Sequence, residues 1–170
     1  KLNGFLKSSA KSILGLLCDN FLGILQTTQI DAWTGEINIL QESLIKYDKD
    51  AKIIFEYDIP RLGKRIDVVL LLKGVIFCLE FKVGEKNILE ADVDQVLDYA
   101  LDLKNFHKFS FDKIIVPILV ATNYHKSSTE IKMSIYDDKI INPLVTGVEG
   151  ITSLIDKTLN KHPDTVIIQT

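Results

Sequence analysis

The spacing of apolar residues along the chain changes near residue 50. Before that point apolar residues recur at steps of three and four, which predicts one helix over 5–26 and a second over about 30–47. Beyond it come short runs rich in Ile, Val, Leu and Phe, which predict strands at 53–59, 66–72 and 75–82. Lys73 and Gly74 separate the last two runs and predict a tight hairpin turn.

Helical spacing returns over about 89–107, where the apolar residues form a single stripe. The continuous apolar run at 113–121 is typical of a strand that is buried on both faces. A strand–helix–strand crossover of this length predicts parallel pairing of 75–82 with 113–121. The rest of the chain predicts a strand near 131–136, a loop that contains Pro143, a helix near 148–160 and a short apolar end at 166–168.

These elements predict one α/β domain over residues 1–170, because no repeat, low-complexity tract or linker divides them. Hydrophobic residues make up 46% of the chain and charged residues 25%, which is ordinary for a globular domain. A single domain of this length buries roughly 70% of the surface of its unfolded chain, so a substantial core is expected. The formal net charge is −3, so any binding of nucleic acid would need a local basic patch.

Cys18 and Cys78 lie far apart in apolar surroundings, which favours a reducing compartment over a disulfide framework. We therefore expect a cytoplasmic protein. The apolar run at 13–18 follows several lysines, as in a signal peptide, but Asp19 and Asn20 interrupt it and no small-residue cleavage site follows. The run is too short to span a membrane, so we expect a buried helix there and no membrane association.

The hairpin turn determines which residues of its two strands face each other. If the residues that flank the turn pair with each other, Asp67 falls opposite Glu80 and Arg65 falls opposite Lys82. Alternation along each strand then places Asp67, Glu80 and Lys82 on one face of the sheet.

Two carboxylates that face each other at the ends of apolar strands repel unless a partner holds them. Mg²⁺ takes carboxylate and carbonyl oxygens, so Asp67, Glu80 and the backbone carbonyl of Phe81 predict a divalent-cation site. Lys82 would lie beside it, placed to position or help deprotonate an attacking water. The alternative is that Asp67 and Glu80 are solvated charges that pair with Arg65 and Lys82.

Two helical residues are further candidates for this site. Glu36 lies at the edge of the apolar face of its helix and can point toward the sheet. Gln95 lies at the margin of the apolar stripe in the helix at 89–107, close to its start, where its amide can reach a water or a phosphate. The alternatives are a surface glutamate and an ordinary glutamine at a helix boundary.

The chain resembles the PD-(D/E)XK nuclease superfamily in one ordered set of residues: Glu36, Asp67, Glu80-Phe-Lys82 and Gln95-Val-Leu-Asp-Tyr-Ala100. This resemblance covers about residues 30–122 and implies a restriction-endonuclease-like α/β fold, in which helices flank the mixed central sheet of an αβββαβ core. Residues 123–170 would form a C-terminal extension. One departure is that Ile66 precedes Asp67 where the name of the superfamily has proline.

The resemblance implies metal-dependent hydrolysis of phosphodiester bonds, in DNA more than in RNA. Asp67, Glu80 and Glu36 would hold Mg²⁺ or Mn²⁺. Lys82 would orient the attacking water, and Gln95 would orient water or phosphate. Three basic residues would contact the nucleic-acid backbone next to the site: Arg61, Lys64 and Arg65.

More narrowly, the string Glu56-Tyr-Asp-Ile-Pro-Arg-Leu-Gly-Lys-Arg-Ile-Asp67 is similar to the nuclease-like N-terminal domains fused to Schlafen-type superfamily 1 helicases in bacteria. This similarity implies that the chain is a module of a longer protein, covalently linked to a helicase domain. The complete triad favours a nuclease. The acidic residues at 94, 98 and 102 favour the alternative, a catalytically silent nuclease-fold module that binds nucleic acid or a partner domain. A third class is a ligand-binding or scaffold α/β domain with solvated charges.

Overall fold

The computed structural model of the chain describes residues 1–47, 51–59 and 62–163. Its first helices are α1 (Leu2–Lys7), α2 (Ala10–Asn20) and α3 (Thr27–Ser43). The prediction of one buried helix over 5–26 is therefore wrong. Ser9 is extended and its side chain accepts a hydrogen bond from the Ser12 amide, so it caps α2 and interrupts the helix. In α2 only Ile13 is buried, and residues 21–26 lie outside any helix.

One mixed sheet contains five strands in the order β1-β2-β3-β4-β5. The strands are β1 (Lys52–Ile59), β2 (Lys64–Leu72), β3 (Val75–Lys82), β4 (Ile114–Ala121) and β5 (Leu144–Thr146). Strands β1, β2 and β3 pair antiparallel, whereas β4 pairs parallel with both β3 and β5. The strands predicted at 53–59, 66–72, 75–82 and 113–121 are confirmed, as is the parallel pairing of the last two. The prediction of a strand near 131–136 is wrong, because in this segment Met133 makes only an isolated bridge to Ile141.

The crossover helix α4 (Glu90–Phe106) and the last helix α5 (Ile151–Lys161) confirm the helices predicted at 89–107 and 148–160. Two short 3₁₀ helices, η1 (Lys108–Ser110) and η2 (Val148–Gly150), follow α4 and precede α5. The α/β class, with a mixed sheet flanked by helices, is thus confirmed. No helix within the described ranges has the length and apolarity that a membrane crossing requires. The apolar end expected at 166–168 lies outside the described residues.

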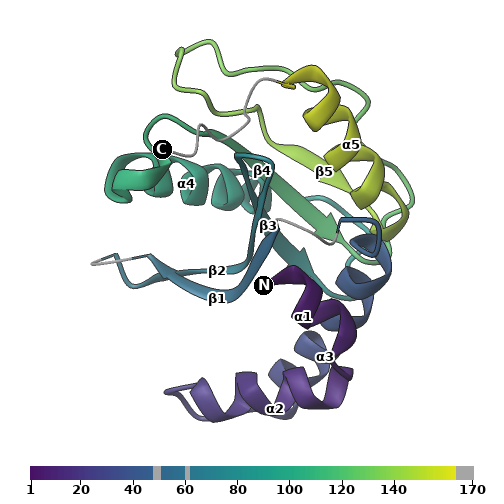
Figure 1. Cartoon of the computed structure of the whole chain (residues 1–170). Helices are drawn as coiled ribbons and strands as arrows, with labels where there is room; N and C mark the ends of the chain where they lie inside the picture. The colour runs from purple at the N-terminus through teal and green to yellow at the C-terminus, as the bar shows by residue number, and fades with distance from the viewer. Residues whose placement is uncertain (48–50, 60–61, 164–170) are drawn as a thin grey trace.

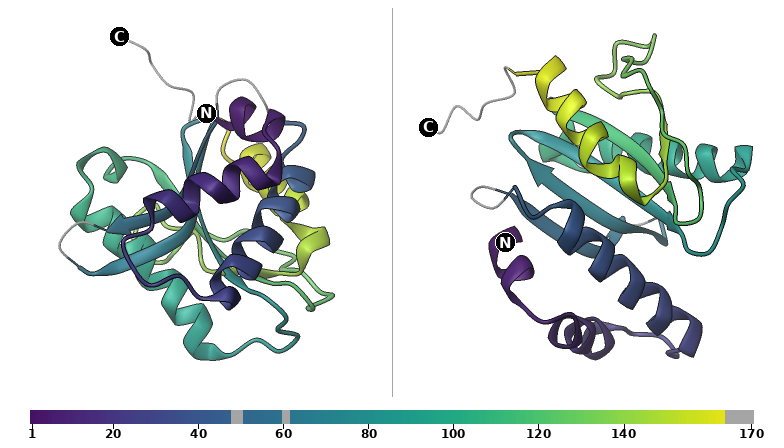
Figure 2. Two further views of the ribbon diagram at one scale, coloured as in Figure 1. Left: turned by 90° about the horizontal axis from the view of Figure 1, so that it is seen from below. Right: turned by 90° about the vertical axis from the view of Figure 1, so that its right-hand side faces the viewer.

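Helices cover both faces of the sheet, as Figures 1 and 2 show. The larger core lies between the sheet and the helices α1, α3 and α5, and the smaller core lies between the sheet and α4. Strand β4 is buried along its whole length, as its continuous apolar sequence predicts. Helix α2 packs mainly against α3, and its one buried residue, Ile13, joins the larger core.

Strand β1 changes sides along its length. Ile53 and Phe55 pack against the larger core, whereas Tyr57 and Ile59 pack against the smaller core. Regular alternation would keep all four on one face of the sheet. The change falls at Glu56, whose φ of 52° lies in the left-handed region that non-glycine residues seldom adopt.

Strand β2 changes sides at the same level, between Ile66 in the smaller core and Val68 in the larger core. The ladder between β2 and β3 keeps the predicted register from the turn as far as Val68 and Leu79, and the pairing ends there. Asp67 and Glu80 therefore lie just beyond the last paired residues. Figure 1 shows the outer part of the β1–β2 hairpin bending away from β3 and running beneath α4.

Candidate active site

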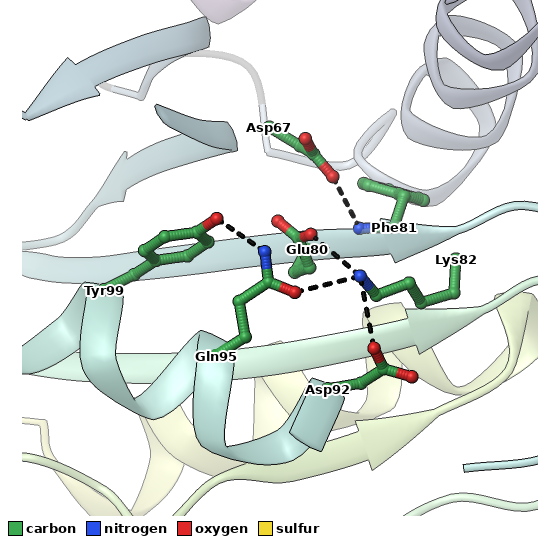
Figure 3. A network of polar contacts seen from close by, with 7 residues as sticks. All are labelled: Asp67, Glu80, Phe81, Lys82, Asp92, Gln95 and Tyr99. Carbon is green, nitrogen blue, oxygen red and sulfur yellow. Dashed lines mark hydrogen bonds and ion pairs between the residues drawn. The ribbon is translucent and has the colours of Figure 1, made fainter. Parts of the chain in front are cut away.

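Asp67 lies where β2 leaves β3. Its Oδ2 accepts a hydrogen bond of 2.8 Å from the Phe81 amide, as Figure 3 shows, so a side chain replaces the backbone acceptor that a continued ladder would supply. The predicted direct pairing of Asp67 with Glu80, and of Arg65 with Lys82, is therefore wrong. The reason is the change of sides in β2, which the alternation rule cannot foresee. Asp67 nevertheless reaches the end of β3, through its carboxylate.

Two glutamates near Asp67 are deeply buried, with Glu36 4% exposed and Glu80 5% exposed. Among the described residues, no donor reaches Oε2 of Glu36 or Oε2 of Glu80, although the Asp67 and Glu80 carboxyls lie close enough to share a hydrogen bond when one of them holds a proton. Burial raises the pKa of Glu36 to about 9, and the charges of Asp67, Glu56 and Glu80 raise it further. Burial likewise raises the pKa of Glu80 to about 8; the Asp67 charge adds to the rise and Lys82 opposes it. Both carboxyls thus retain a proton near neutral pH.

Asp67 shares this environment. Burial raises the pKa of its carboxyl, and the hydrogen bond from the Phe81 amide opposes the rise. Buried carboxyls of this kind are not solvated strand-end charges, so that interpretation is wrong for Glu80, as is a surface position for Glu36. A buried carboxyl without a hydrogen-bond partner needs either a proton or a cation beside it.

The donor set suits a hard divalent cation, because carboxylate oxygens are the ligands that Mg²⁺ and Mn²⁺ prefer. As the side chains lie, the described residues include no group of three or more His, Cys, Asp or Glu placed to enclose a metal ion. The carboxyls of Glu36, Asp67 and Glu80 would have to move closer together to bind one. At Phe81 the group in contact with Asp67 is the amide, and the predicted carbonyl ligand stays a prediction.

Lys82 is held by three acceptors, shown in Figure 3: Nζ lies 3.3 Å from Glu80 Oε1, 2.9 Å from Gln95 Oε1 and 3.3 Å from Asp92 Oδ1. Gln95 in turn donates a hydrogen bond of 2.7 Å to the Tyr99 hydroxyl, one turn further along α4. Burial alone would lower the pKa of Lys82, but Glu80 and Asp92 outweigh it and the pKa rises. The ammonium is therefore charged at neutral pH, and it acts as a hydrogen-bond donor rather than as a base.

Glu56 is a site residue that sequence reasoning missed. Its Oε1 accepts a hydrogen bond of 2.6 Å from Trp33 Nε1, and its other oxygen forms an ion pair with Arg65. The Arg65 guanidinium lies over the Phe21 ring at 5.2 Å, and the Phe21 and Trp33 rings meet edge to face at 5.5 Å. The side chains of Trp33, Glu56, Arg65 and Phe21 thus form a closed cycle of contacts at the point where β1 and β2 change sides.

The sequence did contain a signal for Glu56. The ladder between β1 and β2 is interrupted at Glu56 and Asp67, but its register is the same on both sides of that interruption. This register places Glu56 opposite Asp67. A tight turn between β1 and β2 predicts the same register, and with it the position of Glu56 beside Asp67. Asp92 was also missed, and only its position in the first turn of α4 pointed to it.

The predicted basic residues do not gather on one surface. Lys64 points to the α4 side of the sheet, where Nζ forms a 2.9 Å ion pair with Asp102. Arg65 points to the other side, toward Glu56. Arg61 lies outside the described residues. The expectation of a single basic patch is therefore not supported for Lys64 and Arg65.

No protein-family model matches the chain, and no curated protein matches it in sequence. A function for the chain must therefore be inferred from the geometry of the carboxyl cluster and the chemistry of its neighbours.

Proposed function

We propose that the chain is a metal-dependent hydrolase of phosphodiester bonds. The observation that carries this proposal is the pair of buried carboxyls, Glu36 and Glu80, each with an oxygen that no described residue binds, beside Asp67 and the charged Lys82. An anionic substrate would be repelled by ionised carboxyls alone, so the cluster is suited to phosphate chemistry only when a cation neutralises it.

The more particular proposal is a nuclease with the restriction-endonuclease-like arrangement of the PD-(D/E)XK superfamily. It is supported by the order of elements α3, β1, β2, β3, α4 and β4 along the chain. Four of these elements carry the expected residues: Glu36 on α3, Asp67 on β2, Glu80 and Lys82 on β3, and Gln95 on α4.

Glu36, Asp67 and Glu80 would hold Mg²⁺ or Mn²⁺, which supplies Lewis-acid polarisation of the phosphate and lowers the pKa of an attacking water. Because the pKa values of Glu36 and Glu80 are raised to about 9 and about 8, these two carboxyls give up protons when they take part in binding. Lys82 stays charged and donates to the attacking water or to a phosphate oxygen. Gln95, anchored by Tyr99, fixes the direction of the Lys82 ammonium.

The proposed substrate is nucleic acid, DNA more than RNA, and the proposed location is the cytoplasm. Arg65 is the described basic residue next to the carboxyl cluster, and its side chain is 39% exposed. The net charge of −3 favours modest affinity for nucleic acid, which a covalently linked helicase domain would raise.

The test is cleavage of labelled single- and double-stranded DNA and RNA in Mg²⁺, in Mn²⁺ and in chelator. Asp67→Asn and Lys82→Ala are expected to lower the rate by about 10²–10⁴-fold, since each removes a group that contacts the reacting atoms. The matched controls are Asp98→Asn and Lys86→Ala, which alter exposed residues of the same types and should retain the wild-type rate.

The alternative is a silent module that binds nucleic acid without cleaving it. It is favoured by the absence, among the described side chains, of a group already closed around a metal position. Binding without cleavage in every cation would establish that alternative, and cleavage that persists in both site variants would contradict the proposed mechanism. A second readout is the melting temperature: Mn²⁺ should raise it in the wild type and not in Glu80→Gln.

A further inference from the structure

A second site lies at the opposite end of α4 from the carboxyl cluster. Here a cavity of about 370 Å³ opens between the end of α4, the β2–β3 turn and the start of β4. Val69, Leu71, Ile76 and Leu103 form its apolar floor. Its volume falls in the range of natural binding pockets, which are about 300–1,000 Å³.

One wall of the cavity is aromatic. The rings of Tyr57 and His107 meet edge to face at 6.4 Å, and the His107 and Phe109 rings lie 5.9 Å apart. Phe109 is 77% exposed, and Phe106 and Phe111 in the same segment are also exposed. Aromatic side chains are enriched at protein interfaces, and an exposed group of them extends beyond what a small ligand in the cavity would cover.

The segment that carries these aromatic side chains, residues 106–111, is fixed by hydrogen bonds to buried groups. Lys104 is buried, and its ammonium donates hydrogen bonds to the backbone carbonyls of Ser110, Phe111 and Lys113. His107 Nδ1 and Ser110 Oγ also form a hydrogen bond of 2.9 Å. A surface that is fixed before binding loses little conformational entropy when a partner docks.

The charged side chains that line the cavity are all basic. Lys52, Lys73 and Lys113 line it, and none of the described lining residues is acidic. Lys73 also lies in the field of Asp156, which itself pairs with Lys46 on the α5 side. An apolar floor within a cationic rim is complementary to an apolar anchor flanked by carboxylates.

We propose that this cavity is a docking site for an acidic segment of a partner protein, which inserts one aromatic or branched aliphatic side chain between the α4 end and the β2–β3 turn. The partner's flanking carboxylates pair with the lysine rim, and its chain packs on the exposed phenylalanines. Since this cavity and the Lys82–Gln95 pair lie at opposite ends of α4, a docked partner leaves the carboxyl cluster open. The inference does not depend on the proposed nuclease activity.

The test is phage-display selection of random 12-residue peptides on the 170-residue chain, followed by fluorescence anisotropy with the enriched peptides. We expect enriched peptides to combine Asp or Glu with at least one large apolar residue. Phe109→Ser and the double variant Lys52→Glu/Lys113→Glu should each weaken their binding by about tenfold or more. All three positions are at or near the surface, and circular dichroism checks that the variants fold.

The matched controls change the same chemistry elsewhere on the surface. Leu22→Ser removes another exposed apolar side chain, and Lys7→Glu/Lys11→Glu reverses two exposed lysines on α1 and α2; neither should alter binding. The proposal is overturned by three outcomes: no enrichment, enriched peptides that are neutral or basic, or binding that the cavity variants leave unchanged. Self-association of the chain that Phe109→Ser abolishes would also overturn it, in favour of a second copy as the occupant.

Discussion

Lys104 and Glu36 are both ionisable residues that the fold buries, yet their surroundings differ. The Lys104 ammonium donates to three backbone carbonyls, whereas Oε2 of Glu36 has no partner among the described residues. Burial lowers the pKa of Lys104, and burial raises the pKa of Glu36 to about 9. The first charge is satisfied by the chain itself and stabilises a loop. The second has an oxygen that no described residue satisfies, as the metal-binding role proposed for it would require.

The largest expected effect comes from removing the satisfied charge. Lys104→Met keeps the aliphatic stem but leaves the carbonyl oxygens of Ser110, Phe111 and Lys113 without their donor. We expect the free energy of unfolding to fall by about 3 kcal/mol, measured by urea denaturation at pH 7. Lys108→Met, at an exposed position four residues further on, is the control. An unchanged midpoint for Lys104→Met would mean that the comparison does not hold.

Removing the unsatisfied carboxyl of Glu36 should change the free energy of unfolding in the opposite direction. Glu36→Gln removes a carboxyl that must stay protonated in the folded chain at a pH where the unfolded chain ionises it. We expect the cation-free protein to become more stable by at least about 2 kcal/mol at pH 8 and to change little near pH 4.5. The shift of melting temperature in Mn²⁺ should disappear. Glu42→Gln, exposed on the same helix, should change neither quantity, and a destabilised Glu36→Gln would indicate that the carboxylate has a structural partner.

In Glu36→Gln, the pH dependence of the free energy of unfolding reports on Glu80. The folded pKa of Glu80 is about 8 against an ordinary value of 4.5, so between these values the folded state binds more protons than the unfolded state. Stability from this group is therefore fully present below about pH 4.5 and is lost as the pH rises toward 8. In chelator, the free energy of unfolding of Glu36→Gln should fall by at least about 1 kcal/mol from pH 5 to pH 8. A rise over that interval would contradict the assigned environment of Glu80.

The smallest effect is expected at Glu56. Glu56→Gln can still accept the hydrogen bond from Trp33 but loses the ion pair with Arg65, which is partly exposed. The free energy of unfolding should fall by only about 0.5 kcal/mol, as for other partly exposed pairs. Asp58→Asn, exposed on the same strand, serves as the control in the same chemical denaturation. A loss of several kcal/mol would show that the change of sides in β1 depends on the ionised Glu56 carboxylate.

The sequence predicts the parts of the fold that short-range rules determine. Lys73 and Gly74 adopt φ values of 49° and 78°, as a type I′ turn requires, so the hairpin register follows directly from the turn. The apolar stripe of α4 and the buried strand β4 were predictable for the same reason. Ser9 also carried a capping signal for the break between α1 and α2, which the apolar spacing obscured.

Long-range packing determines the rest. The change of sides at Glu56 and Asp67 brings Ile59 and Ile66 against α4, and no local pattern announces it. For that reason the sequence identified Asp67 and Glu80 as neighbours but gave the wrong contact between them. The three-residue strand β5 was also beyond prediction, because so short a run has no recognisable period.

The hydrogen bond between the Phe81 amide and Asp67 Oδ2 has a spectroscopic consequence. An amide proton that points at a carboxylate reports the charge and position of that carboxylate through its chemical shift, whereas its neighbours in regular ladders report only the strand. The Phe81 amide signal in a nitrogen–proton correlation spectrum should therefore move when Asp67 gains a proton or a cation. One resonance would then follow occupancy of the site without any substrate.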